Sequence, residues 1–164
     1  MNSVSLLIGG NQGDRRALID AATALIAERI GPVVAASRVY ETLPWGNFGE
    51  GRVQPFLNRA LVVDTKLGAQ AVLDEALAIE AELGRRRSPE TGRRLYHSRP
   101  MDIDIIFFND EVIESPTLTV PHPRMHLRRF VLEPLNEVVP HYRHPLTGLT
   151  VSEMLDRLKQ DEEK

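Results

Sequence analysis

Two acidic residues inside an otherwise apolar segment give the sharpest chemical signal in this sequence. Asp102 and Asp104 alternate with Ile103 and Ile105. Because successive strand side chains point to opposite faces, we expect both carboxylates on one face, with their Cβ atoms about 7 Å apart, and both isoleucines in the core. Two acids on one face of a core strand are costly unless they are solvated, paired or bound to metal. Magnesium takes a few carboxylates together with water and phosphate oxygens, so the pair is a candidate site for two Mg²⁺ ions and a triphosphate.

The acidic pair is also compatible with two different roles. The residues are ordinary exposed acids if the strand lies at the edge of a sheet. Glycosyltransferases also use an Asp-x-Asp pair to hold a metal-bound nucleotide sugar. The pattern alone leaves these alternatives open.

Cationic residues favour the phosphate interpretation. Residues 85–99 hold six arginines and one acid, and residues 122–129 hold three arginines and no acid. The planar guanidinium group suits phosphate oxygens, and phosphoryl transfer depends mainly on positioning and charge neutralisation. A solvated surface loop is the alternative. His122 lies between two prolines that fix its direction, so it could bond to a phosphate, although a single histidine is more often structural.

The glycine-rich segment 9–13 does not indicate a known nucleotide loop. It lacks the Gly-Lys-Ser/Thr ending of a P-loop and the spacing of a dinucleotide-binding motif. A tight turn explains its glycines sufficiently. Any nucleotide site in this chain is therefore of another kind.

Composition narrows the class of protein. The chain has 164 residues, 42% of them apolar, and no cysteine, which excludes disulfides, thiolate zinc sites and cysteine nucleophiles. Its net charge of −3 argues against non-specific nucleic-acid binding. The apolar run at residues 4–8 is too short for a signal peptide or a membrane span. We expect one domain over residues 1–164 with a frayed end, a cytoplasmic location, and no nucleic-acid or membrane partner.

The elements that must position these residues follow from periodicity and from turn residues. We expect strands at 4–8, 33–41, 56–65 and 100–108, with a short strand at 112–113. Helices are expected at 15–29, 68–84, 125–137 and 150–160, with Gly84 as a C-cap. The order β-α-β-β-α-β predicts an α+β, ferredoxin-like core, in which an antiparallel sheet has both helices on one face and C-terminal helices are additions.

Several segments in this order resemble the 6-hydroxymethyl-7,8-dihydropterin pyrophosphokinases of folate biosynthesis. The most specific are RPMDIDI at 99–105, LTVPH at 118–122 and RRFVLEPL at 128–135. Earlier matches are IGGN at 8–11, YETLPWG at 40–46 and FLN at 56–58. Gly10 stands where a serine is usual in the family, and Phe56 keeps the ring of a frequent tyrosine without its hydroxyl.

The resemblance implies transfer of the two terminal phosphates of ATP to a pterin alcohol, with release of AMP, by a monomer acting on small molecules. It implies two Mg²⁺ ions on Asp102 and Asp104, which would be catalytic together with Arg85, Arg87 and Arg99. The implied ATP-binding residues are Glu80, Arg87, Arg99, Ile105, Thr119, His122 and Arg128. The implied pterin-binding residues are Thr42, Leu43, Trp45, Phe56, Asn58, Asp102 and Phe130.

Two other functions remain possible from the residues. A ferredoxin-like module that binds a small anion without turnover would explain the fold and the arginines, but not the paired aspartates followed by His122 and Phe130. An RNA-binding module would also use the arginines. The acidic remainder of the chain and the absence of adjacent strand aromatics count against RNA.

Overall fold

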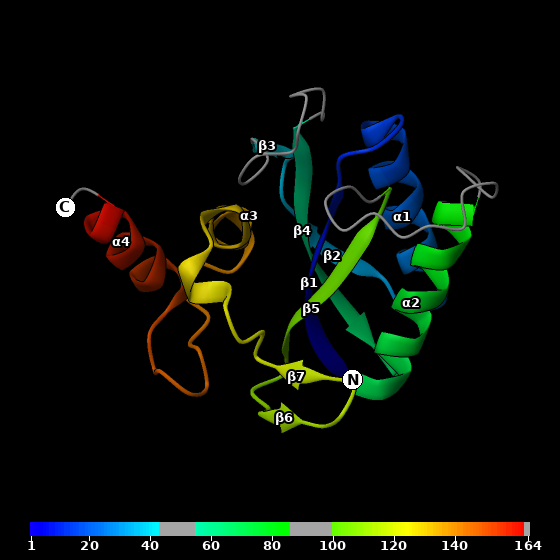
Figure 1. The fold of residues 1–164 in the computed structure, drawn as a ribbon. Coiled ribbons are helices and arrows are strands. Elements are labelled where there is room, and N and C mark those ends of the chain that lie inside the picture. Colours follow the sequence, from blue (N-terminus) through cyan, green and yellow to red (C-terminus); the bar gives the residue numbers. More distant parts are fainter. Residues whose placement is uncertain (43–54, 86–99, 163–164) are drawn as a thin grey trace.

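The computed structural model describes residues 1–42, 55–85 and 100–162, and its main element is an antiparallel sheet. The strand order is β2-β4-β1-β5, and β3 also pairs with β4. The strands of this sheet are β1 (Asn2–Gly10), β2 (Val33–Ala36), β3 (Tyr40–Thr42), β4 (Phe56–Thr65) and β5 (Asp102–Phe108). This topology confirms the predicted ferredoxin-like α+β arrangement (Figure 1).

Helices α1 (Arg15–Arg29) and α2 (Ala69–Arg85) cover one face of the sheet (Figure 1). The helices and the strands together enclose a first hydrophobic core. Its fully buried residues include Leu6, Ile8, Ile19, Ile26 and Ile79. α1 begins where the Asp14 side chain accepts a hydrogen bond from the Ala17 N–H, as expected for an N-cap. Gly84 lies inside α2 and is not the predicted C-cap.

The C-terminal elements form a second core on the opposite face. They are a 3₁₀ turn, η1 (Met125–Leu127), and helices α3 (Arg129–Val138) and α4 (Val151–Glu162). Leu132 and Leu135 of α3 are completely buried against residues of the sheet that include Leu7, Ala60 and Phe107. The C-terminal additions therefore cover part of the sheet face opposite α1 and α2.

A bulge in β5 changes which side chains face which core. Leu6 of β1 pairs with Ile105, whereas Ser5 pairs with Phe107, so Ile106 is an extra residue. Before the bulge, Ile103 and Ile105 face the first core. After it, Phe107 joins the second core.

The structure corrects three of the predicted elements. The expected strand 33–41 is two strands, because the Ser37 hydroxyl accepts the Ala60 N–H at 2.9 Å in place of a backbone carbonyl. The expected helix 125–137 divides at Arg128, whose backbone is extended. The short strand lies at Ile113–Glu114 (β6) and pairs with an unpredicted strand at Thr119–Val120 (β7). Within the described ranges, no helix combines the length and the apolar character needed to cross a bilayer.

His144 fastens the connection between α3 and α4 and is 5% exposed. Its Nδ1 accepts hydrogen bonds from the N–H groups of Leu146 and Thr147, at 3.1 and 3.2 Å, and its ring lies edge-on to Phe107. Burial, and secondarily His126, lower the pKa of His144. The unfolded chain therefore takes up this proton first as the pH falls.

We predict that the free energy of unfolding falls as the pH drops below about 6.5, the ordinary histidine value, and continues to fall through the lower folded pKa. His144→Asn keeps a short acceptor without a titrating ring, so it should reduce this loss between pH 7.5 and pH 5.5 in denaturant titrations. His141→Asn, at an exposed position, is the control. An unchanged pH dependence in His144→Asn would contradict the assignment.

Candidate active site

A row of paired residues crosses the sheet at the end of β1. Gly9 pairs with Asn58 of β4 on one side and with Asp102 of β5 on the other. Directly paired residues project to the same face, and neighbouring strands lie about 4.8 Å apart, so the Asn58 and Asp102 backbones are roughly 10 Å apart with a bare glycine between them. The row therefore presents the Asn58 amide and the Asp102 carboxylate on two sides of Gly9, which has no side chain.

Position 9 requires glycine because the neighbouring strand β4 approaches its backbone closely. A Cβ at this position would lie 2.3 Å from the Leu57 carbonyl oxygen and 2.4 Å from Asn58 Oδ1. Gly9 and Gly10 both belong to β1, so the expected tight turn does not explain them. Gly13, with φ of 66°, is the glycine of this segment that needs a turn conformation.

The two aspartates lie as the alternation predicts. Asp102 and Asp104 are half-buried, and Ile103 and Ile105 enter the first core on the opposite face. Within the described ranges, no group of three or more histidine, aspartate or glutamate residues is placed to hold a metal ion. A carboxylate pair fits Mg²⁺, which completes its shell with water and phosphate oxygens.

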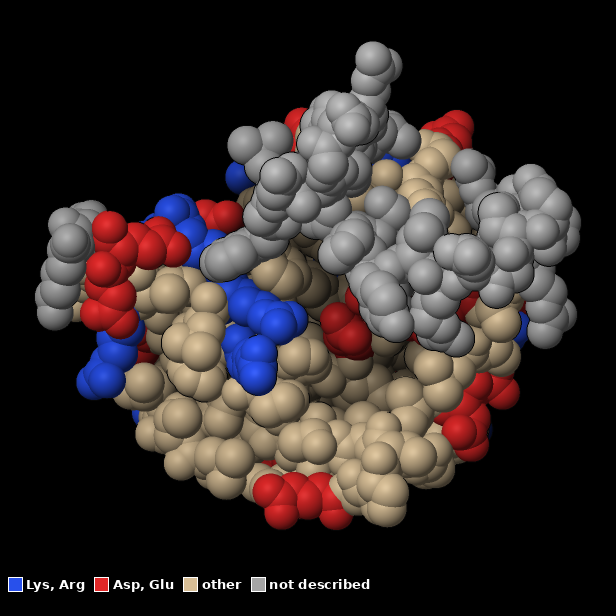
Figure 2. All heavy atoms as spheres, viewed as in Figure 1, with Lys and Arg blue, Asp and Glu red and all other residues tan. Residues whose placement is uncertain are grey.

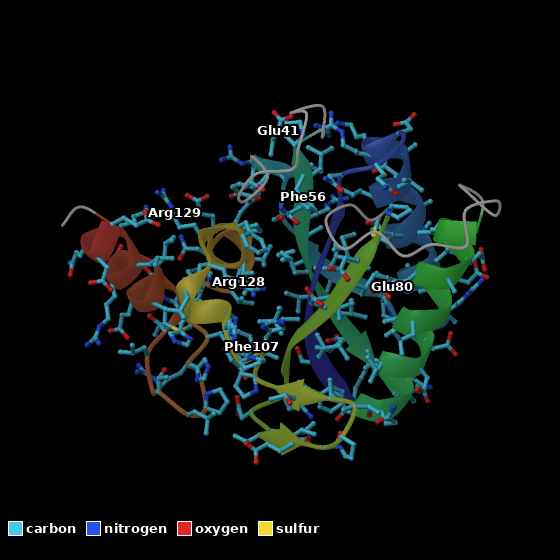
Figure 3. All side chains as sticks on the ribbon, viewed as in Figure 1. Glu41, Phe56, Glu80, Phe107, Arg128 and Arg129 are labelled. Atoms are coloured by element: carbon cyan, nitrogen blue, oxygen red, sulfur yellow. The ribbon has the colours of Figure 1, made fainter. Side chains whose placement is uncertain are left out.

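Glu80 of α2 holds the strand that carries the aspartates. Its Oε2 accepts the Ile103 N–H at 2.7 Å, on the outer side of the edge strand β5. Figure 3 shows Glu80 on α2, beside β5. Glu80 therefore contacts the backbone between Asp102 and Asp104.

The segment after β7 lies against the same strand. The His122 N–H donates to the Ile106 carbonyl at 3.1 Å. Burial lowers the pKa of His122, Arg128 lowers it further, and Asp102 opposes them. His122 Nδ1 is buried without a hydrogen-bond partner within the part of the chain that the structure describes. Burial thus favours the neutral form of His122, and both a cation and an anion of the site act on it.

Aromatic and polar side chains lie on the β3–β4 side of the row. Asn58 Nδ2 donates to Thr42 Oγ1 at 3.3 Å, and Thr42 pairs with the half-buried Phe56. Phe130 comes from α3, which packs against β3 and β4, and its ring centroid is 5.8 Å from the Arg128 guanidinium carbon. Thr42, Phe56, Asn58 and Phe130 can therefore present two flat faces and a hydrogen-bonding edge to a ligand.

Charge is divided across the hollow between these elements. Figure 2 shows basic atoms on the rim formed by the C-terminal elements and acidic atoms on the facing side. Arg128 belongs to the C-terminal elements (Figure 3) and Asp102 to β5, and the two are close enough for both to affect the pKa of His122. This division suits a ligand that carries phosphates and cations.

Other predicted site residues are placed differently or lie outside the described ranges. The Ile105 side chain is 4% exposed in the first core, so a nucleotide could meet only its backbone. Thr119 is exposed on β7. Arg85 ends α2, and its side chain is not described. Leu43, Trp45, Arg87 and Arg99 lie outside the described residues.

A separate cavity of about 350 Å³ lies on the other face of the β3–β4 hairpin, at the first turn of α1. Leu57 and Glu41 line it. Each lies next along its strand to residues that project to the other face of the sheet, the face that carries the aspartates. Arg15 also lines the cavity, and its guanidinium donates a hydrogen bond to the Pro55 carbonyl at 2.8 Å. This cavity is distinct from the aspartate site.

Comparison with known proteins identifies relatives over most of the chain. The family model for 7,8-dihydro-6-hydroxymethylpterin-pyrophosphokinase (HPPK) matches residues 5–140. The 2-amino-4-hydroxy-6-hydroxymethyldihydropteridine pyrophosphokinase of Porphyromonas gingivalis is 41% identical over 146 residues, which cover 88% of this chain and 95% of the relative. The Bacillus subtilis protein of the same name is 41% identical over 140 residues, 84% of this chain and 79% of the relative.

Solved structures share the fold. A crystal structure of HPPK-DHPS in complex with substrates has a TM-score of 0.73 at 16% identity, and wild-type Plasmodium falciparum HPPK-DHPS with SDX-DHP has 0.71 at 18%. They match 99% and 100% of this chain, which spans 44% and 45% of those longer chains. With the sequence matches over residues 5–140, these observations establish that the chain belongs to the 7,8-dihydro-6-hydroxymethylpterin-pyrophosphokinase family.

Proposed function

We propose that this chain transfers diphosphate from ATP to the hydroxymethyl group of 6-hydroxymethyl-7,8-dihydropterin and releases AMP, a step of folate synthesis. The observation that carries the proposal is the row Asn58–Gly9–Asp102 across β4, β1 and β5. It places an amide that can read a heterocycle and a carboxylate that can hold a metal on two sides of a residue without a side chain. The names of the relatives support the same activity.

The pterin binds between the rings of Phe56 and Phe130, because flat heterocycles stack well on aromatic faces. Asn58 offers a donor and an acceptor, and the donor also reaches Thr42. The hydroxymethyl group then points over Gly9 towards Asp102. Leu43 and Trp45 complete this side of the site in the proposal.

The triphosphate binds on the side of β5, where Asp102 and Asp104 would hold two Mg²⁺ ions. When bound, magnesium neutralises phosphate charge and polarises the phosphoryl oxygens. Arg128, with Arg85, Arg87 and Arg99, supplies further positive charge to the phosphates. Glu80 keeps the aspartate-bearing strand in place through the Ile103 N–H.

The reaction is an in-line displacement at the β-phosphorus of ATP. The pterin hydroxyl oxygen bonds to this phosphorus, the bond from the phosphorus to the oxygen that bridges to the α-phosphate breaks, and AMP leaves with that oxygen. The hydroxyl proton passes to water. Burial favours the neutral form of His122, and the side chain takes part as a hydrogen-bonding group beside the phosphates.

The proposal also covers the state of the protein. The chain acts as a single-domain monomer in the cytoplasm, with ATP and the pterin as its small-molecule partners. The two cores support one domain, because they lie on opposite faces of the same sheet. Thr119 and the backbone of Ile105 lie near the nucleoside in this arrangement.

The aspartates provide the direct test of the reaction. Wild-type protein with ATP and Mg²⁺ should form AMP when 6-hydroxymethyl-7,8-dihydropterin is added and should form none without it. Asp102→Asn and Asp104→Asn should each lower the rate by at least about 100-fold, since they remove charge that holds the metal and the phosphates, while the melting temperature stays within a few degrees.

Glu114→Gln, on the exposed strand β6, is the matched control and should keep the wild-type rate. Formation of ADP in place of AMP would refute diphosphate transfer. Near-wild-type rates in both aspartate variants would refute the metal assignment.

Phe130 tests the pterin side separately. Phe130→Ala should weaken pterin binding about tenfold or more because it removes one stacking face, while ATP binding changes less than about threefold. Isothermal titration with each substrate measures both constants. Phe130→Leu retains apolar packing against the second core, so it separates the loss of a flat face from unfolding. Equal weakening of both ligands would remove Phe130 from the pterin pocket.

A further inference from the structure

Glu137 joins the last turn of α3 to the segment that begins β3. Its Oε1 accepts the Tyr40 hydroxyl at 2.8 Å, and its Oε2 accepts the Arg38 backbone N–H at 3.1 Å. The Arg38 guanidinium lies 4.6 Å from the centre of the Tyr40 ring and so restricts the orientation of that ring. We call these contacts the Glu137–Tyr40 tie.

Tyr40 lies in the row that forms the floor of the site. It pairs directly with Asn58, which pairs with Gly9, which pairs with Asp102. Paired residues share a face, so Tyr40 projects to the side on which α3 packs, as its bond to Glu137 requires. A shift of the Tyr40 backbone would therefore act directly on its paired residue, Asn58.

Glu137 lies on the same side of α3 as Phe130. The two residues are seven positions apart, two helical turns, and about 10 Å along the axis. Phe130 occupies the first turn of α3 and Glu137 the last. The helix thus carries a proposed pterin-stacking ring at one end and an attachment to the opposite wall at the other.

β3 is a short strand, so a contact outside the sheet can affect its position. It has three residues and pairs with β4. Ser37, just before it, is held by hydrogen bonds to Ala60 of β4. The tie connects this strand to α3 through side chains.

We infer that Glu137 and Tyr40 are positioning residues that adjust the separation between Phe130 and the Asn58 wall, and so tune affinity for the pterin ring. The inference rests on the proposed function, since it concerns the pocket assigned there. Neither residue touches the reacting atoms; each acts through the two walls that hold the pterin ring.

The tie contributes little to global stability. Arg38 Nε is 4.0 Å from Glu137 Oε1, and the side chains are 75% and 38% exposed, so their ion pair is weak. The position of α3 is set mainly by Leu132 and Leu135 in the second core. Loss of the tie should therefore alter the pocket more than the unfolding equilibrium.

Four variants test the inference: Glu137→Ala, Glu137→Gln, Tyr40→Phe and the double variant Tyr40→Phe/Glu137→Ala. Glu137→Ala and Tyr40→Phe should raise the Kd and KM for 6-hydroxymethyl-7,8-dihydropterin about three- to tenfold, the scale of a typical net hydrogen bond. The Kd for ATP and the melting temperature should hardly change. Glu137→Gln keeps an oxygen for the Tyr40 hydroxyl, so it should lie closer to wild type than Glu137→Ala.

The double variant tests whether the pair acts as a unit. It should lose no more affinity than Glu137→Ala alone, because the second substitution removes a contact that is already absent. Glu133→Ala is the matched control: it is also on α3, its side chain is 32% exposed, and its 3.0 Å ion pair with Arg129 stays within the helix. This variant should bind the pterin like wild type.

Each outcome is decisive. A lower melting temperature with unchanged pterin Kd would make the tie merely structural and overturn the inference. Wild-type pterin affinity in both single variants, with an active wild-type enzyme, would overturn the inference but leave the proposed function intact. Wild-type protein that neither binds the pterin nor forms AMP would overturn both.

Discussion

The site depends on the pairing of β1 with β4 and β5. This pairing aligns Asn58, Gly9 and Asp102 in one row, although they come from distant parts of the sequence. Leu6 and Ile8, fully buried against the helices, fix the register, because a shift of one residue would move them to the opposite face. The hydrophobic core thereby determines where a polar site can form.

The bulge in β5 lets the two ends of one strand pack differently. Near Asp102 and Asp104 the strand keeps its carboxylates on the open face and its isoleucines in the first core. One extra residue, Ile106, reverses the alternation so that Phe107 packs against the C-terminal elements. Without this reversal, Phe107 would face the helices α1 and α2, and the second core would lose a large aromatic residue.

Local patterns in the sequence predict the parts of the structure that local physics decides. The apolar spacing of residues 15–29 gives the same bounds as the observed α1, and alternation gives the faces of Asp102 and Ile103. The break at Ser37 was not predictable, because it depends on a hydroxyl that bonds to Ala60, 23 positions away. The need for Gly9 likewise arises from Asn58, which only the paired strands bring near it.

Long-range contacts also explain why the two sides of the site differ in origin. The sheet provides Asn58 and Asp102 from β4 and β5, strands that contribute side chains to both cores. Phe130 comes from α3, whose first turn is preceded by the extended Arg128 and whose packing belongs to the second core. The second core sets where α3 lies on the sheet, and Glu137 adds a hydrogen bond to Tyr40, across 97 positions of sequence, that holds the last turn of the helix against β3. A substrate pocket between a sheet and a helix packed on it can thus have its width adjusted by a few exposed hydrogen bonds, with little change to either core.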